Sequence, residues 1–237
     1  MNIKKLYEDD DILAIEKPSG ISMHQDGRKS EDFTIADWFS EQYPASINVG
    51  EPFVFNGEEI KRPGIVHRLD KDTSGVLLLV KSQEAHQFLK KQFQNTEIKK
   101  TYIAIVFGHI KKDAGVIEEP IGRSPSDFRR RLAGRGAKGE LREATTEYVV
   151  LERGTSKDGE KFSIIEAHPK TGRTHQIRVH MKFLSYPVLC DKLYAPKNFC
   201  PTKIGRLALH AKSIEFKNLK GEAIKVESSL PEEFTNF

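Results

Sequence analysis

The sequence predicts an α+β fold, with a mixed and mostly antiparallel central sheet flanked by helices and loops. Two observations favour this class: the chain contains many short strand-like apolar segments, and few helical segments separate them. Its 237 residues, of which 38% are hydrophobic and 30% charged, suffice for a sizeable core. Because we find neither an internal repeat nor a low-complexity linker, we expect one domain over residues 1–237.

Strand-like and helical segments follow one another along the chain. We expect strands, in chain order, within residues 11–20 and at 76–80, 100–108, 145–152, 162–169 and 206–216. We expect helices at residues 34–44, 82–95 and 174–184. The stretches 45–62 and 109–143 are polar or weakly periodic, so we expect them to be mostly loop.

Local signals support several of these elements. Ser82 has a side chain suited to a helix N-cap, and Ala85, Leu89 and Phe93 follow at helical spacing. The connector 153–161 contains glycine and joins two apolar segments, which indicates a hairpin.

Composition bounds the class of protein. No apolar run approaches the length of a membrane span, and the N-terminus lacks the apolar region of a signal peptide. We therefore expect a cytoplasmic protein that has no membrane partner. We also expect a monomer. The two cysteines, Cys190 and Cys200, have no further Cys or His at metal-binding spacing, so we expect two free thiols.

The charge distribution is uneven. Residues 1–60 have a net charge of −8, whereas residues 61–237 have a net charge of +12. The segment 123–142 alone carries seven basic and two acidic residues. Such a basic region fits a polyanionic partner, and it equally fits a solvated loop, so charge leaves both interpretations open.

One stretch, "IVHRLDKDTSGVLLLVKS" at residues 65–82, places five ionisable side chains between two apolar segments. Burying charge is costly unless it is paired, so packing does not explain them. Asp70 and Asp72 suit a Mg²⁺ site, but no second acidic cluster completes it. A kinase-like loop would need a Gly-rich loop and an Asp-Phe-Gly motif, which are missing. A turn braced by salt bridges is the third interpretation.

Four segments together resemble a known family. The stretch beginning at Gly64 resembles the central motif of the pseudouridine synthases of the RluA type, which isomerise uridine to pseudouridine in ribosomal and transfer RNA. Three further segments match in the expected order: "LYEDDDILAIEKPSGISMH" (6–24), "KKTYIAIVFG" (99–108) and "TGRTHQIRVHM" (171–181), with "RLALHA" after the last. The resemblance implies one pseudouridine synthase catalytic domain, with no separate N-terminal RNA-binding domain.

The resemblance also implies the catalytic residues. Asp70 is expected to be the nucleophile, Tyr102 the active-site tyrosine and Arg178 the basic partner of the aspartate. A carboxylate suits covalent catalysis, an arginine favours its ionised form, and a tyrosine offers both a stacking ring and a hydroxyl for proton transfer. His67 is expected to orient the loop by hydrogen bonding, and Ile177 to seal the site from water.

Basic residues are expected to hold the RNA. A uridine in folded RNA must be flipped out to react, and a guanidinium next to the nucleophile can fill the vacated space. Residues expected to contact RNA are Arg68, Arg173, His175, Arg129, Arg130 and Arg131. No metal and no cofactor is expected, because the isomerisation involves no redox chemistry.

The sequence leaves several points open. It does not identify the RNA or the uridine, nor whether the nucleophile attacks the ribose or the uracil. The alternative function is a catalytically inactive RNA-binding protein with the same fold. The presence of Asp70, Tyr102 and Arg178 argues against that alternative, because lost turnover leaves such residues free to change.

Overall fold

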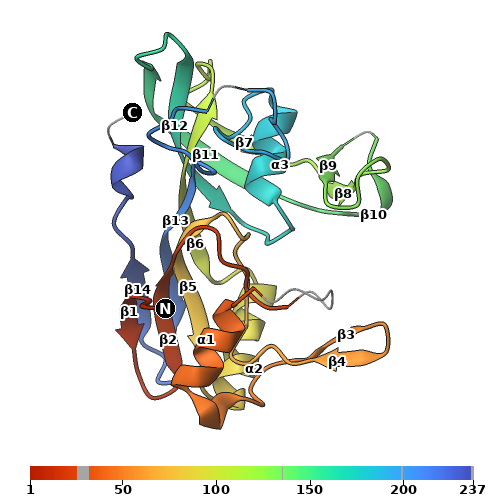
Figure 1. Cartoon of the computed structure of the whole chain (residues 1–237), viewed down its shortest axis with the longest axis vertical. Coiled ribbons are helices and arrows are strands. Elements are labelled where there is room, and N and C mark those ends of the chain that lie inside the picture. The colour runs from red at the N-terminus through yellow and green to blue at the C-terminus, as the bar shows by residue number, and fades with distance from the viewer. Residues whose placement is uncertain (26–31, 135, 199, 236–237) are drawn as a thin grey trace. The chain divides into compact units, whose positions relative to one another are not determined.

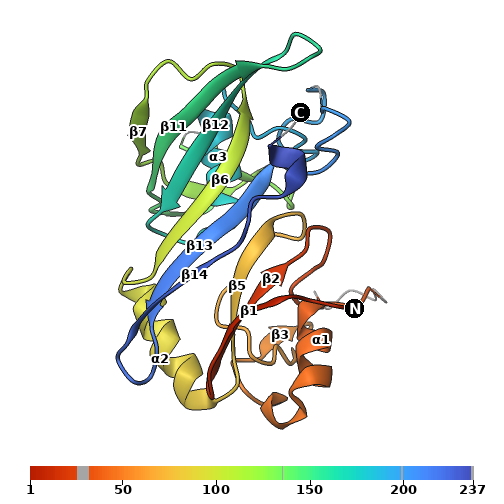
Figure 2. The same ribbon diagram turned by 90° about the vertical axis from the view of Figure 1, so that its left-hand side faces the viewer.

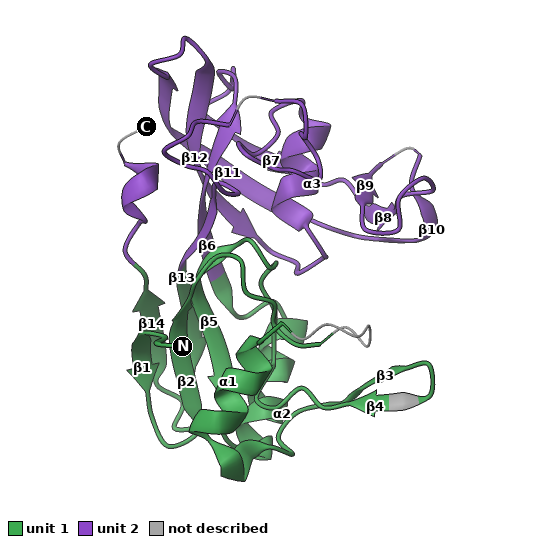
Figure 3. Cartoon of the chain, viewed as in Figure 1, with its two compact units in different colours: residues 1–99, 213–228 green, residues 100–212, 229–237 purple. Residues whose placement is uncertain are grey.

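The computed structural model describes residues 1–25, 32–134, 136–198 and 200–235 (Figure 1). The chain divides into two compact units: residues 1–99 with 213–228, called unit 1, and residues 100–212 with 229–237, called unit 2 (Figure 3). Each unit is assembled from two separate stretches of chain. One domain over residues 1–237 stays a prediction. No helix in the described ranges is long and apolar enough to span a bilayer.

Unit 1 is built on three antiparallel strands in the order β1 (Lys5–Glu8), β2 (Ile12–Lys17) and β5 (Ser74–Val80). All seven residues of β5 are buried, and its register pairs Val80 with Ile12 and Gly75 with Lys17. In the same unit, β14 (Ala223–Glu227) pairs with the second half of β13 (Leu209–Lys217). The buried apolar strand β5 therefore occupies the place that the sequence predicted.

The two helices of unit 1 both begin at side-chain caps, of which the sequence predicted the one at Ser82. For α1 (Ile35–Gln42), Thr34 and Asp37 form a reciprocal capping box. For α2 (Gln83–Gln94), the Ser82 side chain accepts a hydrogen bond from the Ala85 amide, as expected. Leu89 is fully buried and packs with β5 in the core of this unit.

Residues 45–62 are not all loop, contrary to the prediction. A short 3₁₀ helix, η1 (Pro44–Ser46), is followed by a hairpin of β3 (Phe53–Phe55) and β4 (Glu58–Ile60). Asn56 and Gly57 both have positive φ angles, which is the conformation that a two-residue hairpin turn requires. The Asn-Gly dipeptide was the signal for this hairpin.

In unit 2 the antiparallel strands follow the order β6 (Lys99–Phe107), β12 (Lys161–Pro169), β11 (Thr146–Thr155) and β7 (Ala114–Ile117) (Figure 2). The predicted hairpin is confirmed as β11 and β12. Helix α3 (Gln176–Phe183) packs against this sheet through Ile177 and Met181. The antiparallel pairs and the few helices confirm the predicted α+β class.

The polar segment 109–143 also contains more regular structure than expected. Besides β7 it forms a three-stranded sheet in the order β10 (Lys138–Arg142), β8 (Ile121–Arg123) and β9 (Arg131–Ala133). All five residues of β10 are exposed, so neither face imposes the apolar alternation from which strands are predicted. The chain ends in a short 3₁₀ helix, η2 (Glu232–Phe234).

The two cysteines form a disulfide, so the prediction of two free thiols is wrong. The Cys190–Cys200 bond closes a loop whose ends are ten residues apart in sequence. Cys190 has a φ of 58°, in the left-handed region that favours glycine. The pairing depends on how the chain folds around α3, which spacing alone does not reveal.

Reduction of this disulfide is expected to lower the stability of the protein by roughly 3 kcal/mol, because the open loop regains conformational entropy in the unfolded chain. For a chain of this size, that corresponds to a melting temperature lower by about 6–12 °C. Calorimetry with and without a phosphine reductant measures the shift. The double variant Cys190→Ser with Cys200→Ser is the control, and its melting temperature should not respond to reductant. An unchanged wild-type melting temperature after complete reduction, verified by thiol counting, contradicts the prediction.

Candidate active site

The charged stretch at residues 67–72 forms a turn immediately before β5. The amide of Thr73 donates a hydrogen bond of 3.1 Å to the carbonyl of Asp70, which closes the turn. Leu69 is buried, whereas Arg68 is exposed and Asp70 is half-buried. Leu69 therefore anchors the turn by its burial, while its two neighbours lie nearer the surface.

This turn is held by a buried lysine, Lys17, which was not among the predicted site residues. Lys17, at the end of β2, is fully buried, and its ammonium donates 2.9 Å hydrogen bonds to the carbonyls of Pro18, Lys71 and Thr73. A buried ammonium needs such acceptors, because leaving water without them is costly. The signal in the sequence was a lysine at the end of the otherwise apolar strand "ILAIEK".

His67 joins the turn to the strand that follows it. Its Nε2 accepts a hydrogen bond of 2.9 Å from the amide of Leu78, and its ring stacks on Phe93 of α2 with centroids 4.9 Å apart. The side chain therefore cross-links the turn, β5 and α2. That His67 orients the catalytic loop stays a prediction.

Tyr102 lies on β6 in unit 2, opposite Ala167 of β12, and is half-buried against the core of that unit. Lys100, two residues earlier, shares the same face of the strand. Its ammonium donates a hydrogen bond of 3.1 Å to the carbonyl of Thr171, and burial lowers its pKa to about 8. Lys100 thus ties the tyrosine strand to the segment that leads into α3.

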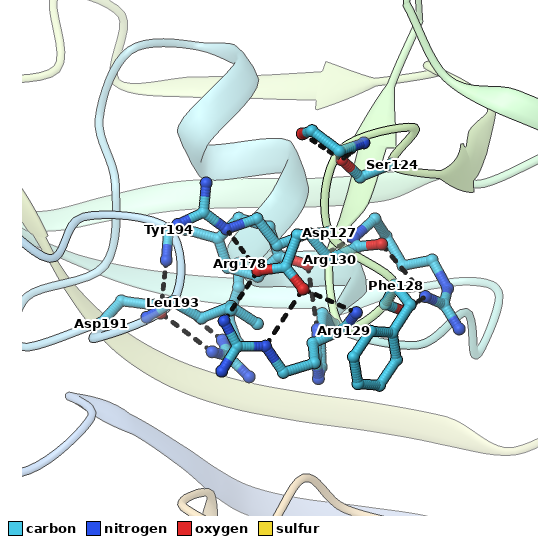
Figure 4. A network of polar contacts seen from close by, with 12 residues as sticks. Ser124, Asp127, Phe128, Arg129, Arg130, Arg178, Asp191, Leu193 and Tyr194 are labelled. Carbon is cyan, nitrogen blue, oxygen red and sulfur yellow. Dashed lines mark hydrogen bonds and ion pairs between the residues drawn. The ribbon is translucent and has the colours of Figure 1, made fainter.

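Arg178 lies on α3 and forms a two-pronged ion pair with Asp191 (Figure 4). Its Nε lies 2.8 Å from Oδ2 of Asp191, and its Nη2 lies 2.9 Å from Oδ1. The Arg178 side chain is 8% exposed and that of Asp191 is not exposed at all. Burial raises the pKa of Asp191, but the hydrogen bonds and charge of Arg178 outweigh burial and hold that pKa below its usual value.

The other residues of the third motif are held by local contacts. His175 caps α3 in a left-handed conformation, and its Nδ1 lies 2.9 Å from the hydroxyl of Tyr194. Arg173 donates from Nε to the carbonyl of Glu143 at 2.9 Å. Ile177 is buried in the core of unit 2. The arginine and the histidine that were expected to contact RNA thus also shape the start of α3.

The three consecutive arginines lie at the edge of the small sheet. Arg129 makes a two-pronged contact with Asp127, at 3.0 Å from Nε and 2.8 Å from Nη2, and is exposed. Arg130 lies 3.6 Å from the same carboxylate. Hydrogen bonds from Arg129 lower the pKa of Asp127 to about 2. Arg131 donates to the carbonyls of Phe128 and Arg130. The basic segment 123–142 is therefore organised by internal contacts, and Arg135 lies outside the described residues.

Comparison with solved structures defines the class of protein. The fold matches human RNA pseudouridylate synthase domain containing 1 with a TM-score of 0.74 and 25% identity, over 97% of this chain and 84% of that one. Residues 11–183 match the family model described as RNA pseudouridylate synthase.

Curated relatives agree with the structural match. An uncharacterized RNA pseudouridine synthase of Bacillus subtilis is 36% identical over 98% of this chain and 71% of its own length. The ribosomal large subunit pseudouridine synthase D of Borreliella burgdorferi is 39% identical over 98% of this chain and 66% of its own length. This chain therefore spans about two thirds of the length of these relatives.

The chain belongs to the RNA pseudouridylate synthase family, and within it to the RluA type. This membership makes it an RNA pseudouridine synthase, an isomerase, and confirms the resemblance read from the four segments.

Proposed function

We propose that the protein isomerises specific uridines to pseudouridines in ribosomal RNA, transfer RNA or both, with Asp70 as the nucleophile. The observation that carries this proposal is the mounting of Asp70: a turn closed on itself, fixed by buried Leu69 and supported by the buried ammonium of Lys17. The name of the Borreliella relative favours ribosomal RNA as the first substrate to test.

The reaction exchanges one glycosidic bond for another. The Asp70 carboxylate forms a covalent bond to ribose carbon 1′ or to uracil carbon 6, and the bond between nitrogen 1 and carbon 1′ breaks. The uracil turns and bonds to carbon 1′ through carbon 5. In the ribose route this bond displaces the carboxylate from carbon 1′, whereas in the uracil route the carboxylate leaves carbon 6 after the new bond has formed. In both routes carbon 5 loses its proton and nitrogen 1 gains one. Atoms balance with no oxidant and no cofactor.

Two residues of unit 2 are proposed to act on the same uridine. Arg178 is proposed to be the basic partner of the Asp70 carboxylate during the reaction. Tyr102 stacks on the base, and its hydroxyl takes part in proton transfer from carbon 5. Ile177 is buried in the core of unit 2 and is proposed to help exclude water from the site.

Basic side chains are proposed to hold the RNA around the flipped uridine. Arg68 is proposed to fill the space that the base leaves, and its exposure two residues before Asp70 supports this role. Phosphate contacts are assigned to Arg173, His175, Arg129, Arg130 and Arg131. Such contacts give an affinity that falls with salt and carry little sequence information.

Tritium release from RNA labelled at uracil carbon 5 tests the proposal, because re-attachment at carbon 5 must expel that hydrogen. Unmodified large-subunit ribosomal RNA and transfer RNA serve as separate substrates. Wild-type protein is expected to release tritium from at least one of them, at a fixed fraction of the uridines. Binding of both RNAs without release from either contradicts the proposal and favours a protein that binds RNA without turnover.

A further inference from the structure

We propose that Asp191 is the positioning residue of the active site: it fixes the plane of the Arg178 guanidinium and thereby sets the rate of isomerisation. The inference rests on the proposed function of Arg178. Asp191 lies in the segment between α3 and β13, thirteen positions after the arginine, and none of the four motifs contains it.

The carboxylate of Asp191 accepts hydrogen bonds from the side chain of Arg178 and from two backbone amides (Figure 4). Its Oδ1 accepts from Nη2 of Arg178 at 2.9 Å and from the amides of Leu193 and Tyr194 at 3.0 Å each. Its Oδ2 accepts from Nε of Arg178 at 2.8 Å. A carboxylate with no exposed surface needs this number of partners to stay ionised. The two backbone contacts fix the carboxylate before it can fix the arginine.

The paired geometry determines the orientation of the guanidinium. The donors of an arginine form a planar, rigid fork, so two parallel contacts on the Nε side fix the plane as well as the position. The aromatic ring of Tyr194 lies under the same group, with the guanidinium carbon 5.1 Å from the ring centroid. Carboxylate and ring together hold Arg178 from two directions.

The segment that carries Asp191 is itself held in place. The hydroxyl of Tyr194 accepts a hydrogen bond of 2.9 Å from the amide of Arg131 and lies 2.9 Å from Nδ1 of His175. The neighbouring Cys190 is cross-linked to Cys200. These contacts restrain the carboxylate on both sides in sequence, as a positioning group requires.

Asp191→Asn is the variant that separates positioning from folding. The amide is isosteric, and its oxygen can still accept from the amides of Leu193 and Tyr194. Its NH₂ group instead meets the donor Nε of Arg178, so one contact of the fork is lost together with the charge. We expect kcat to fall by about 100-fold while KM and RNA affinity stay within about threefold of wild type.

The matched control is Asp113→Asn, which removes an aspartate–arginine pair elsewhere in unit 2. Asp113 lies 2.7 Å from Nη2 of Arg153, and its side chain is 88% exposed. This control should keep wild-type kcat. Asp191→Asn with wild-type kcat overturns the inference. Arg178→Ala run beside it isolates the proposed function: if that variant keeps wild-type kcat, the assignment of Arg178 is wrong instead.

A second measurement reports position without activity. In ¹⁵N NMR spectra, the Nε–H of Arg178 is expected to exchange slowly with water in the wild type and rapidly in Asp191→Asn. The Arg178→Lys variant keeps the charge but lacks the fork, so it should lose kcat to a similar extent. Fast exchange in the wild type, or full activity in Arg178→Lys, contradicts the inference even if Asp191→Asn fails to fold.

Discussion

Replacing Asp70 by asparagine is expected to abolish turnover, with kcat lower by on the order of 10⁴-fold, because a carboxamide has no charged oxygen to form the covalent bond. The folded structure should persist. Asparagine is isosteric with aspartate, Asp70 is half-buried, and the turn is closed through the backbone carbonyl of this residue. RNA affinity should be equal to wild type or slightly higher, because a negative charge near the phosphates is removed.

Tritium release and a filter-binding titration on the same RNA measure the two effects separately. Asp72→Asn is the matched control, since it removes an exposed carboxylate two residues further along the same turn. The control should release tritium at close to the wild-type rate. Appreciable turnover by Asp70→Asn would show that another group forms the covalent bond, whereas equal losses in both variants would point to the charge of the turn.

Local patterns predicted the elements whose environment is local. The continuous apolar run of β5 and the Ser82 cap of α2 each follow from a few consecutive residues, and both are present. The strand β10 was missed because it is exposed throughout and needs no apolar alternation, and β8 and β9 were missed because three residues each are too few to show a period. Their pairing is decided by chain segments that meet only in the folded unit.

The residues of the candidate site also differ in whether their neighbours in sequence reveal them. Asp70 and Arg178 were identified because their neighbours in sequence form recognisable motifs. Lys17 and Asp191 were missed because their meaning lies in partners far along the chain: Lys17 binds carbonyls more than 50 positions away, and Asp191 binds an arginine on another element. The Cys190–Cys200 bond, whose ends are ten residues apart, was missed because two cysteines alone do not indicate a disulfide framework. Residues that support a site are harder to read from sequence than residues that act in it.

Lys17→Met is expected to destabilise the protein by about 3 kcal/mol, because the methionine fills the space of the lysine stem but removes the ammonium from three carbonyl oxygens. The carbonyl of Lys71 keeps a second donor, the amide of Gly20. The melting temperature should fall by roughly 6–12 °C. Two of these carbonyls belong to Lys71 and Thr73, so the turn that carries Asp70 should loosen and kcat should fall as well.

Lys4→Met is the matched control, since it removes an exposed lysine of unit 1 that lies 3.4 Å from Glu16. Exposed pairs of this kind contribute less than about 1 kcal/mol, so its melting temperature and kcat should stay close to wild type. Calorimetry and single-turnover tritium release on the three proteins separate the outcomes. If Lys17→Met melts early yet keeps the wild-type rate at a temperature where it is folded, Lys17 stabilises unit 1 without ordering the turn. A melting temperature equal to wild type would mean that water satisfies the three carbonyls as well as the ammonium does.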